Sequence, residues 1–250
     1  MNNDMTKGLG ILGLLLALGM SIAALIFGWQ ARDLGAGRQS IVVKGLAEKP
    51  VKADLAEWTV AVSTRGDTFA AALKNLRAER PALDRFLAEQ SIPTSAIRVG
   101  GERVEPAFVE EERANGSTRQ VQKGFQATQS LVVSTRDLAR IEAASREILK
   151  LKADGRPVFD EAPVYLLTTL EDVKMSLISS ATDNAQKRAQ EFARSGGVKV
   201  GAMRSASQGA FYILPPSATS ENADYGGTYD KTTIDKIARV VVTIEYRIDR

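Results

Sequence analysis

The amino-acid sequence predicts an α+β fold, with helices packed on one face of an antiparallel-rich sheet and one transmembrane helix before it. Three features of the 250 residues lead to this prediction. Residues 8–29 form an uncharged apolar run, several segments alternate apolar and polar residues, and three segments carry apolar residues at helical spacing. After the apolar run the predicted order is β-β-α-β-β-α-β-α-β-β, in which helices alternate with antiparallel strand pairs.

The apolar run (GLGILGLLLALGMSIAALIFGW) lies between Lys7 and Arg32. As a helix it would extend about 33 Å at about 1.5 Å per residue, against roughly 30 Å of bilayer hydrocarbon. We therefore expect an uncleaved transmembrane anchor at 8–29, a short tail at 1–7 and a tether at 30–40. A cleaved signal peptide is the alternative, although its apolar core usually has about 7–15 residues. Basic residues on both sides of the run leave its orientation open.

Two strands and a helix follow the tether. Residues 41–45 open the first strand, and residues 56–62 (AEWTVAV) alternate as a half-buried strand does. Asp67 or Thr68 can cap the helix that follows, and Pro81 should kink it because proline removes a backbone hydrogen bond. The apolar residues at helical spacing here are Phe69, Leu73, Leu76, Leu83 and Leu87.

The middle of the chain is predicted as a hairpin followed by a second helix. An extended segment at 97–108, with a bulge at its two glycines, and a strand at 125–133 flank a solvated tip at 110–118. Residues 134–137 form a capping-box pattern that opens the helix. Its inward residues are predicted to be Leu138, Ile141, Ile148 and Leu149.

The last third of the chain contains the longest helix and a strong terminal strand. A broken strand at 158–167 precedes the helix, which a capping-box pattern at 169–172 opens and Gly196-Gly197 closes. A strand begins at 198–202, and a polar Pro/Gly-rich loop occupies 209–232. The terminal strand turns six residues to one face: Ala238, Val240, Val242, Ile244, Tyr246 and Ile248.

Composition excludes several classes of function. The chain has 33 Lys+Arg, 30 Asp+Glu, no His and no Cys. Without His or Cys there is no Ser-His-Asp triad, no thiolate nucleophile and no zinc site of the usual kind. A net charge of +3 is weak support for binding nucleic acid, so we expect no nucleic-acid partner.

The remaining chemical candidates have structural explanations. The acidic pairs at 160–161 and 171–172 point apart on a strand or begin a helix. The Glu run at 110–112 lacks the spaced ligands of a calcium loop, and the sequon at 115–117 indicates a turn. Residues 8–13 match GxGxxG, but no strand precedes them. We therefore predict no catalytic, cofactor-binding or metal-ligating residue, and no cofactor.

Residues 211–216 (FYILPP) are apolar and aromatic within the predicted loop. They can dock on a partner or tuck against their own sheet, and the sequence leaves both readings open. One alternative function is therefore a binding module that captures a ligand or protein through the 211–232 loop. A second is a His-free hydrolase that uses carboxylates or a Ser/Lys pair.

Several motifs, in order, resemble the SIMPL domain family of bacterial envelope proteins. IVVKGLAE at 41–48 resembles the family's start, which is usually nearer to VSGxGE, so Lys44 and Leu46 depart from it. GFQA at 124–127 is similar to the family's Gly-Tyr-x-Ala. ATDNAQKRAQEFARSGGVKVG at 181–201 resembles its Ala-rich helix running into Gly-Val-x-Leu-Gly.

The resemblance implies one α+β domain at 41–250, exposed in the periplasm, that forms homo-oligomers and has a loose link to oxidative-stress defence. It offers no established catalytic residues. We therefore expect a single-pass inner-membrane protein, anchored by residues 8–29, that is not an enzyme. It would self-associate as a scaffold or as a ring-like or channel-like assembly. Exposed strand edges would drive the assembly, including the C-terminal strand if it lies at an edge.

Overall fold

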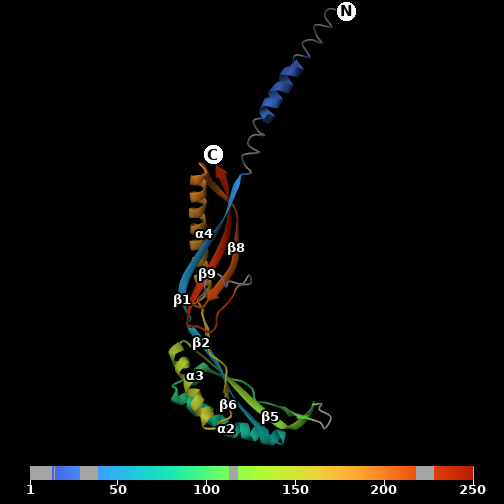
Figure 1. Ribbon diagram of the computed structural model, residues 1–250, viewed down its shortest axis with the longest axis vertical. Coiled ribbons are helices and arrows are strands. Elements are labelled where there is room, and N and C mark those ends of the chain that lie inside the picture. Colours follow the sequence, from blue (N-terminus) through green and yellow to red (C-terminus); the bar gives the residue numbers. More distant parts are fainter. Residues whose placement is uncertain (1–12, 14, 29–38, 113–117, 218–227, 250) are drawn as a thin grey trace, which may run out of the picture. The chain divides into compact units, whose positions relative to one another are not determined.

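The computed structural model shows an α+β fold with antiparallel sheets (Figure 1). It describes residues 13, 15–28, 39–112, 118–217 and 228–249. The chain divides into two compact units, and the segment 41–250 predicted as one domain contributes to both. Among the described residues, unit 1 comprises those up to 47, 175–210 and 240–249, and unit 2 comprises 48–112, 118–174, 211–217 and 228–239.

The predicted transmembrane helix is wrong. Residues 15–28 are helical, but no helix in the described part of the chain is long and apolar enough to cross a membrane. The prediction of a single-pass inner-membrane protein with a periplasmic domain is overturned with it. The predicted tail and most of the predicted tether lie outside the described residues.

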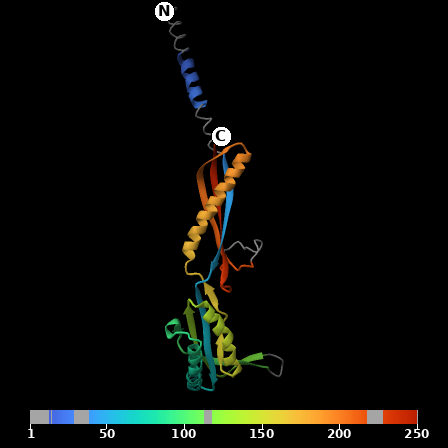
Figure 2. The same ribbon diagram turned by 90° about the vertical axis from the view of Figure 1, so that its left-hand side faces the viewer.

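Unit 1 consists of a three-stranded sheet with one helix on one face (Figures 1 and 2). The strand order is β1-β9-β8. The elements that contribute to it are β1 (Ser40–Lys52), α4 (Leu170–Ser195), β8 (Lys199–Leu214) and β9 (Asp235–Asp249). The predicted face of the terminal strand is confirmed from Ala238 to Tyr246, because its even-numbered residues are buried. The α4 residues buried in this unit are Leu177, Ala181, Ala185, Ala189 and Ala193.

Small side chains let α4 approach the sheet closely. A Cβ atom on Gly45 of β1 would lie 1.9 Å from the backbone oxygen of Ala181 and 2.8 Å from the backbone nitrogen of Ala185. No side chain fits there, since real Cβ contacts shorter than 3.0 Å essentially never occur. The alanine stripe of the sequence therefore marks where a strand passes against the helix backbone.

Unit 2 has a six-stranded sheet that helices α2 (Phe69–Glu89) and α3 (Leu138–Ala153) contact. The main strand order is β3-β5-β2-β6, with β4 also pairing with β5 and β7 also pairing with β2. These strands pair with one another in antiparallel fashion. The strands are β2 (Leu55–Gly66), β3 (Ile97–Val99), β4 (Arg103–Glu112), β5 (Thr118–Thr135), β6 (Val158–Asp160) and β7 (Val164–Leu166), with a 3-10 turn η1 (Thr94–Ala96) before β3.

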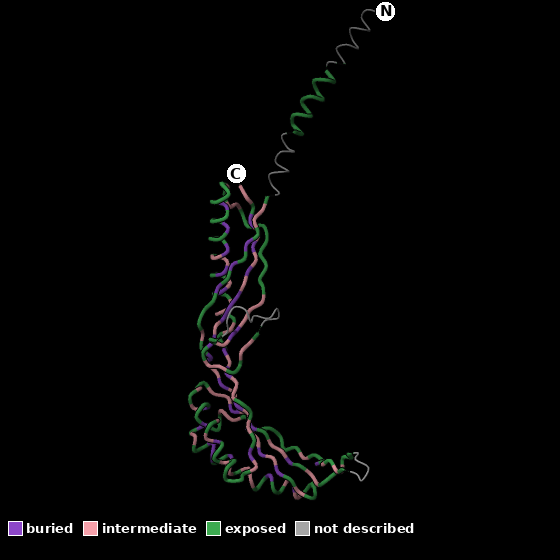
Figure 3. Tube along the Cα trace, viewed as in Figure 1, coloured by how far each residue is buried: buried purple, intermediate pink, exposed green. Residues whose placement is uncertain are grey.

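The hydrophobic core of unit 2 lies between the sheet and the two helices. Figure 3 shows how buried residues recur along the strands. Trp58 of β2 faces Val133 of β5 across the sheet and is fully buried. Other residues of this core include Val60, Val62, Leu76, Leu83, Leu131, Ile141 and Ile148. The alternation at 56–62 and the stripe of the first helix were therefore predicted correctly, apart from Phe69, which is 52% exposed.

Local details correct several predictions. Of the two predicted caps for α2, Asp67 and Thr68, the structure uses Thr68. Its hydroxyl accepts a hydrogen bond from the Ala71 N–H at 3.1 Å. The helix continues through Pro81. The cap of α3 is Asp137 itself, which accepts from the Arg140 N–H, so the capping box starting at Ser134 is wrong. The strand irregularity lies between Pro106 and Phe108 instead of at the two glycines.

Candidate functional site

The candidate site consists of the two edge strands of the unit 1 sheet. The C-terminal strand β9 is the middle strand of this sheet, so it offers no edge for assembly. The two edge strands are β1 and β8. An edge strand presents unpaired N–H and C=O groups, which are a template for another strand.

The edge of β8 is long and open. Every residue of 202–209 is exposed, on both faces of the strand. Residues 205–210 (SASQGA) contain no charged residue and no proline. Charged residues and proline are what natural edge strands use to prevent pairing. Among the described residues, the outer side of β8 meets another segment only at Ile213, which bonds with residues 228–230.

Contacts between β8 and β9 show which backbone groups of β8 face outward. Ser205 donates to Glu245 at 3.3 Å, and a Cβ atom on Gly209 would lie 3.0 Å from the Val241 oxygen. Along β8 from residue 205 to 209, the neighbouring residue of β9 changes from 245 to 241, so the two strands are antiparallel. The Ile248 N–H donates to the Gln39 oxygen, so even-numbered residues of β9 bond to β1 and odd-numbered ones face β8. Between residues 205 and 209 of β8, odd-numbered residues therefore bond to β9, and even-numbered residues such as Ala206 direct their N–H and C=O outward. The alternation does not extend to Ile213, whose N–H and C=O bond with residues 228–230.

The edge of β1 is closed by two α4 side chains. The Leu46 N–H donates to Asn184 Oδ1 at 3.2 Å, and Arg188 Nη1 donates to the Lys44 backbone oxygen at 3.2 Å. Sequence reasoning missed both residues. The available signal was their spacing, four residues apart beside the alanine stripe, which places both on one side of the helix.

A cleft of about 570 Å³ lies where α4 meets β1. Three cations, Lys44, Lys187 and Arg188, line it together with one carboxylate, Glu191. The remaining lining residues are Val42, Val43, Asn184 and Phe192. The cleft follows from the closed edge, because the α4 side chains reach across it to the strand.

The predicted binding loop at 211–232 has a different structure from the one expected. Residues 211–214 complete strand β8, and Ile213 and Leu214 are buried. These two side chains therefore belong to the interior of unit 2, which favours the tucked reading for them. Residues 218–227 lie outside the described part of the chain, and a partner at this segment stays a prediction.

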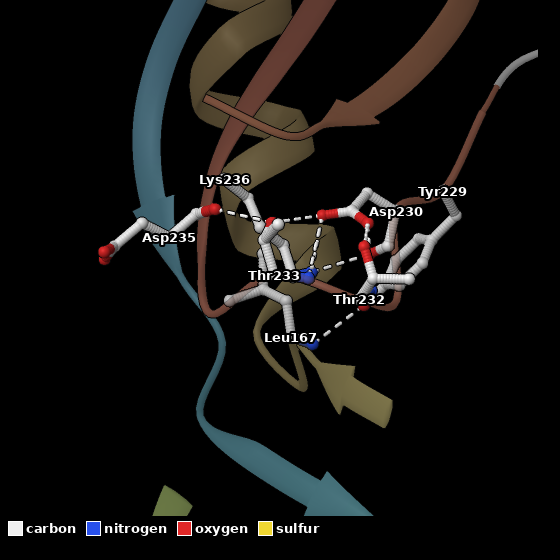
Figure 4. A network of polar contacts seen from close by, with 7 residues as sticks. All are labelled: Leu167, Tyr229, Asp230, Thr232, Thr233, Asp235 and Lys236. Carbon is white, nitrogen blue, oxygen red and sulfur yellow. Dashed lines mark hydrogen bonds and ion pairs between the residues drawn. The ribbon is translucent and has the colours of Figure 1, made fainter. Parts of the chain in front are cut away.

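The end of this segment forms a polar network around a buried ion pair (Figure 4). The Asp230 carboxylate accepts hydrogen bonds from the Thr232 N–H at 2.9 Å, the Thr232 hydroxyl at 2.7 Å and the Thr233 hydroxyl. Lys236 Nζ lies 3.2 Å from Asp230 Oδ2 and donates to the Asp230 backbone oxygen at 2.7 Å. Nearby, the Leu167 N–H donates to the Tyr229 hydroxyl at 2.8 Å.

The Asp230–Lys236 pair is almost fully removed from solvent, with exposed side-chain fractions of 7% and 0%. Burial alone would raise the pKa of the carboxyl, but the hydrogen bonds from Thr233, Thr232 and Lys236 outweigh it and hold the pKa well below its usual range. A carboxylate with so low a pKa is a poor general base near neutral pH. Its geometry is that of a structural turn.

In the described part of the chain, each group of acidic candidates from the sequence has a member that forms an ion pair with a nearby lysine or arginine. Asp160 pairs with Lys152, and Glu171 pairs with Lys174 at 3.7 Å. Glu111 lies 3.2 Å from Arg119 and 3.5 Å from Lys123. The sequon at 115–117 lies outside the described residues.

Two further observations bear on chemistry. A polar cleft of about 330 Å³ in unit 2 is lined by Glu57, Ser95, Ala96, Ile97, Arg98, Val132 and Ser134, a set with no lysine for a Ser/Lys pair. In the described part of the chain, no group of three or more acidic residues lies close enough together to hold a metal ion. The hydrolase alternative stays a prediction.

Among solved structures, the chain has a weak similarity to a "Crystal structure of a hydrolase from Listeria innocua", at 12% sequence identity. The match covers 81% of this chain and 91% of that one, with a TM-score of 0.17, so it carries no argument about fold or activity. No curated protein matches the chain.

Comparison with protein families gives a match over most of the chain. Residues 41–246 match SIMPL, described as "Protein of unknown function (DUF541)". The matched range agrees with the resemblance seen in the ordered motifs of the sequence. The chain therefore belongs to the SIMPL family.

Proposed function

We propose that the protein is a non-catalytic scaffold whose copies assemble through the outer edge of strand β8. The observation that carries this proposal is the outer edge of β8 at 205–209, where every residue is exposed. The N–H and C=O groups that point outward there have no strand partner among the described residues. Pairing with another strand would satisfy them.

The composition of this edge supports the same function. Natural edges are usually blocked by charged side chains or proline, and β1 carries Lys44, Lys49, Pro50 and Lys52. Residues 205–210 of β8 carry none of these. Small side chains there also lower the steric barrier to a second strand.

The test is a single substitution on the outward side of β8. Ala206→Pro removes an N–H that points away from β9, and proline is tolerated at an edge strand. Ala206→Val is the matched control, because it adds similar bulk and keeps the N–H. Multi-angle light scattering after size exclusion would measure the mass of the full chain in a mild detergent, which covers the exposed apolar side chains of 15–28 equally in all variants.

We expect the unmodified chain and Ala206→Val to form a defined multimer that persists on dilution, and Ala206→Pro to lose it. A one-subunit mass for the unmodified chain would overturn the proposal. The same conclusion follows if Ala206→Pro keeps the full mass while its circular dichroism is unchanged.

A further inference from the structure

We infer that the β8 edge pairs with the β8 edge of a second copy, in a two-fold arrangement, because α4 closes the β1 edge against pairing. This inference rests on the proposed function and names its partner surface. Two other pairings would otherwise be open to the molecule: β1 with β1, and β1 with β8 of the next copy.

The closure of β1 uses the groups that a partner strand would need. Residues Lys44 and Leu46 are two apart, so their backbone groups point to the same side. The Lys44 oxygen accepts from Arg188 and the Leu46 N–H donates to Asn184. Both bonds lie within one chain, so they form without the loss of translational freedom that association costs.

Charge acts in the same direction. The outer side of β1 carries Lys44, and Lys187 and Arg188 line the cleft beside it. A second β1 strand would bring an equal set of cations against these. At β8 the uncharged run 205–210 imposes no such repulsion.

The choice of edges decides the kind of assembly. Pairing β1 with β8 of the next copy is heterologous, and if it does not close into a ring it grows into an open filament. Pairing β8 with β8 is isologous, and it closes after two copies with one continuous sheet of three strands from each. Closing the β1 edge therefore prevents filament growth and limits assembly through β8 to two copies.

The absence of cysteine allows a clean cross-linking test. Ser205 bonds to Glu245 on the face away from α4, and by alternation Met203 and Ser207 share that face. Val42 also lies on it, because its neighbour Val43 is buried. We would make Met203→Cys, Ser207→Cys and Val42→Cys separately in the full chain and treat each, and each mixture, with a short bis-maleimide.

We expect at least one β8 variant to cross-link with itself, and no cross-link between Val42→Cys and either β8 variant. A cross-link in those mixtures would overturn the inference, since it reports β1–β8 pairing. Failure of both β8 variants to self-link while the multimer is present would overturn it too.

A second test opens the closed edge. The double variant Asn184→Ala with Arg188→Ala removes both side chains that bond to β1. We expect its mass to grow with concentration and the mixed cross-link with Val42→Cys to appear. Lys187→Ala is the matched control on the same helix, and we expect it to keep the unmodified mass. A double variant with unchanged mass and no mixed cross-link would refute the closing role of these residues.

These outcomes are separate from those of the proposed function. If the unmodified chain has a one-subunit mass, the proposed function fails. If it forms a multimer that Ala206→Pro abolishes and the native mixtures cross-link, the scaffold stands and only the two-fold inference fails.

Discussion

Replacing Lys236 by Met tests the main polar contact inside unit 2. Lys236 is fully buried, and its Nζ atom is the donor to the Asp230 backbone oxygen at 2.7 Å and lies 3.2 Å from Oδ2. Methionine has similar length and no charge, so it fills the space while leaving the carboxylate without its cation.

The magnitude follows from what the carboxylate keeps. Removing one partner from a buried ion pair costs about 3–5 kcal/mol. Asp230 retains its hydrogen bonds from Thr232 and Thr233, so we expect the lower end, about 3 kcal/mol. That is a factor of roughly 100 in the unfolding equilibrium, at about 1.4 kcal/mol per factor of ten.

The assay is urea unfolding followed by tryptophan fluorescence. Trp58 lies in the core of unit 2, and a Trp29→Phe background makes it the reporter. Lys231→Met is the matched control, because Lys231 is exposed and such a change should alter the unfolding free energy by less than about 0.5 kcal/mol. If Lys236→Met costs no more than this control, the account of the pair as a stabilising contact is refuted.

Three further predictions follow from the same structure. Gly45→Ala places a methyl group against the backbone of α4 and should cost about 3 kcal/mol, the upper end of the usual range for overpacking. Gly101→Ala, with open space around it, should have little effect; equal melting temperatures by circular dichroism would contradict the close approach. Gly124→Ala should destabilise unit 2 more than Gly155→Ala, because both have positive φ but only Gly124 would also contact backbone, at 2.5 Å; urea midpoints would show it, and equal midpoints would count against the steric argument. Since the folded pKa of Asp230 is depressed, its contribution to stability is present above the unfolded pKa and is lost as pH falls through the folded one. Asp230→Asn should therefore flatten the acid dependence of the urea midpoint below about pH 4, and an unchanged slope would contradict this.

The elements with local signals could be predicted from the sequence. The alternation around Trp58 predicts a strand because successive side chains on a strand face opposite sides. The longest helix, predicted between 169–172 and Gly196, spans Leu170–Ser195. The family could also be recognised, because its motifs occur in order along the chain.

Predictions failed where a long-range contact overrides the local signal. Residues 209–214 were predicted as loop because of the nearby glycine and prolines, yet they continue β8 because β9 and residues 228–230 pair with it. The membrane helix predicted from the apolar run at 8–29 is a separate case, because no helix among the described residues is long and apolar enough to cross a membrane. The burial of Lys236 could not be predicted, because its neighbours in the sequence give no signal for it. The lysine is buried because the turn at Asp230 supplies its partners.

The sequence by itself determined the family, the α+β class, most of the strands and helices, and the absence of His and Cys chemistry, because each depends on residue type or on contacts between near neighbours. Among the described residues, the tertiary structure alone decided that the strands form two sheets and that β9 is a middle strand. It also decided that Asn184 and Arg188 close β1, while β8 has no strand partner on its outer side at 205–209 in the part of the chain that the structure describes. The physical reason is that a strand lies at an edge when no other segment pairs with one of its two sides. That depends on segments more than a hundred residues apart, as Leu46 and Asn184 are, and no local period in the chain records it.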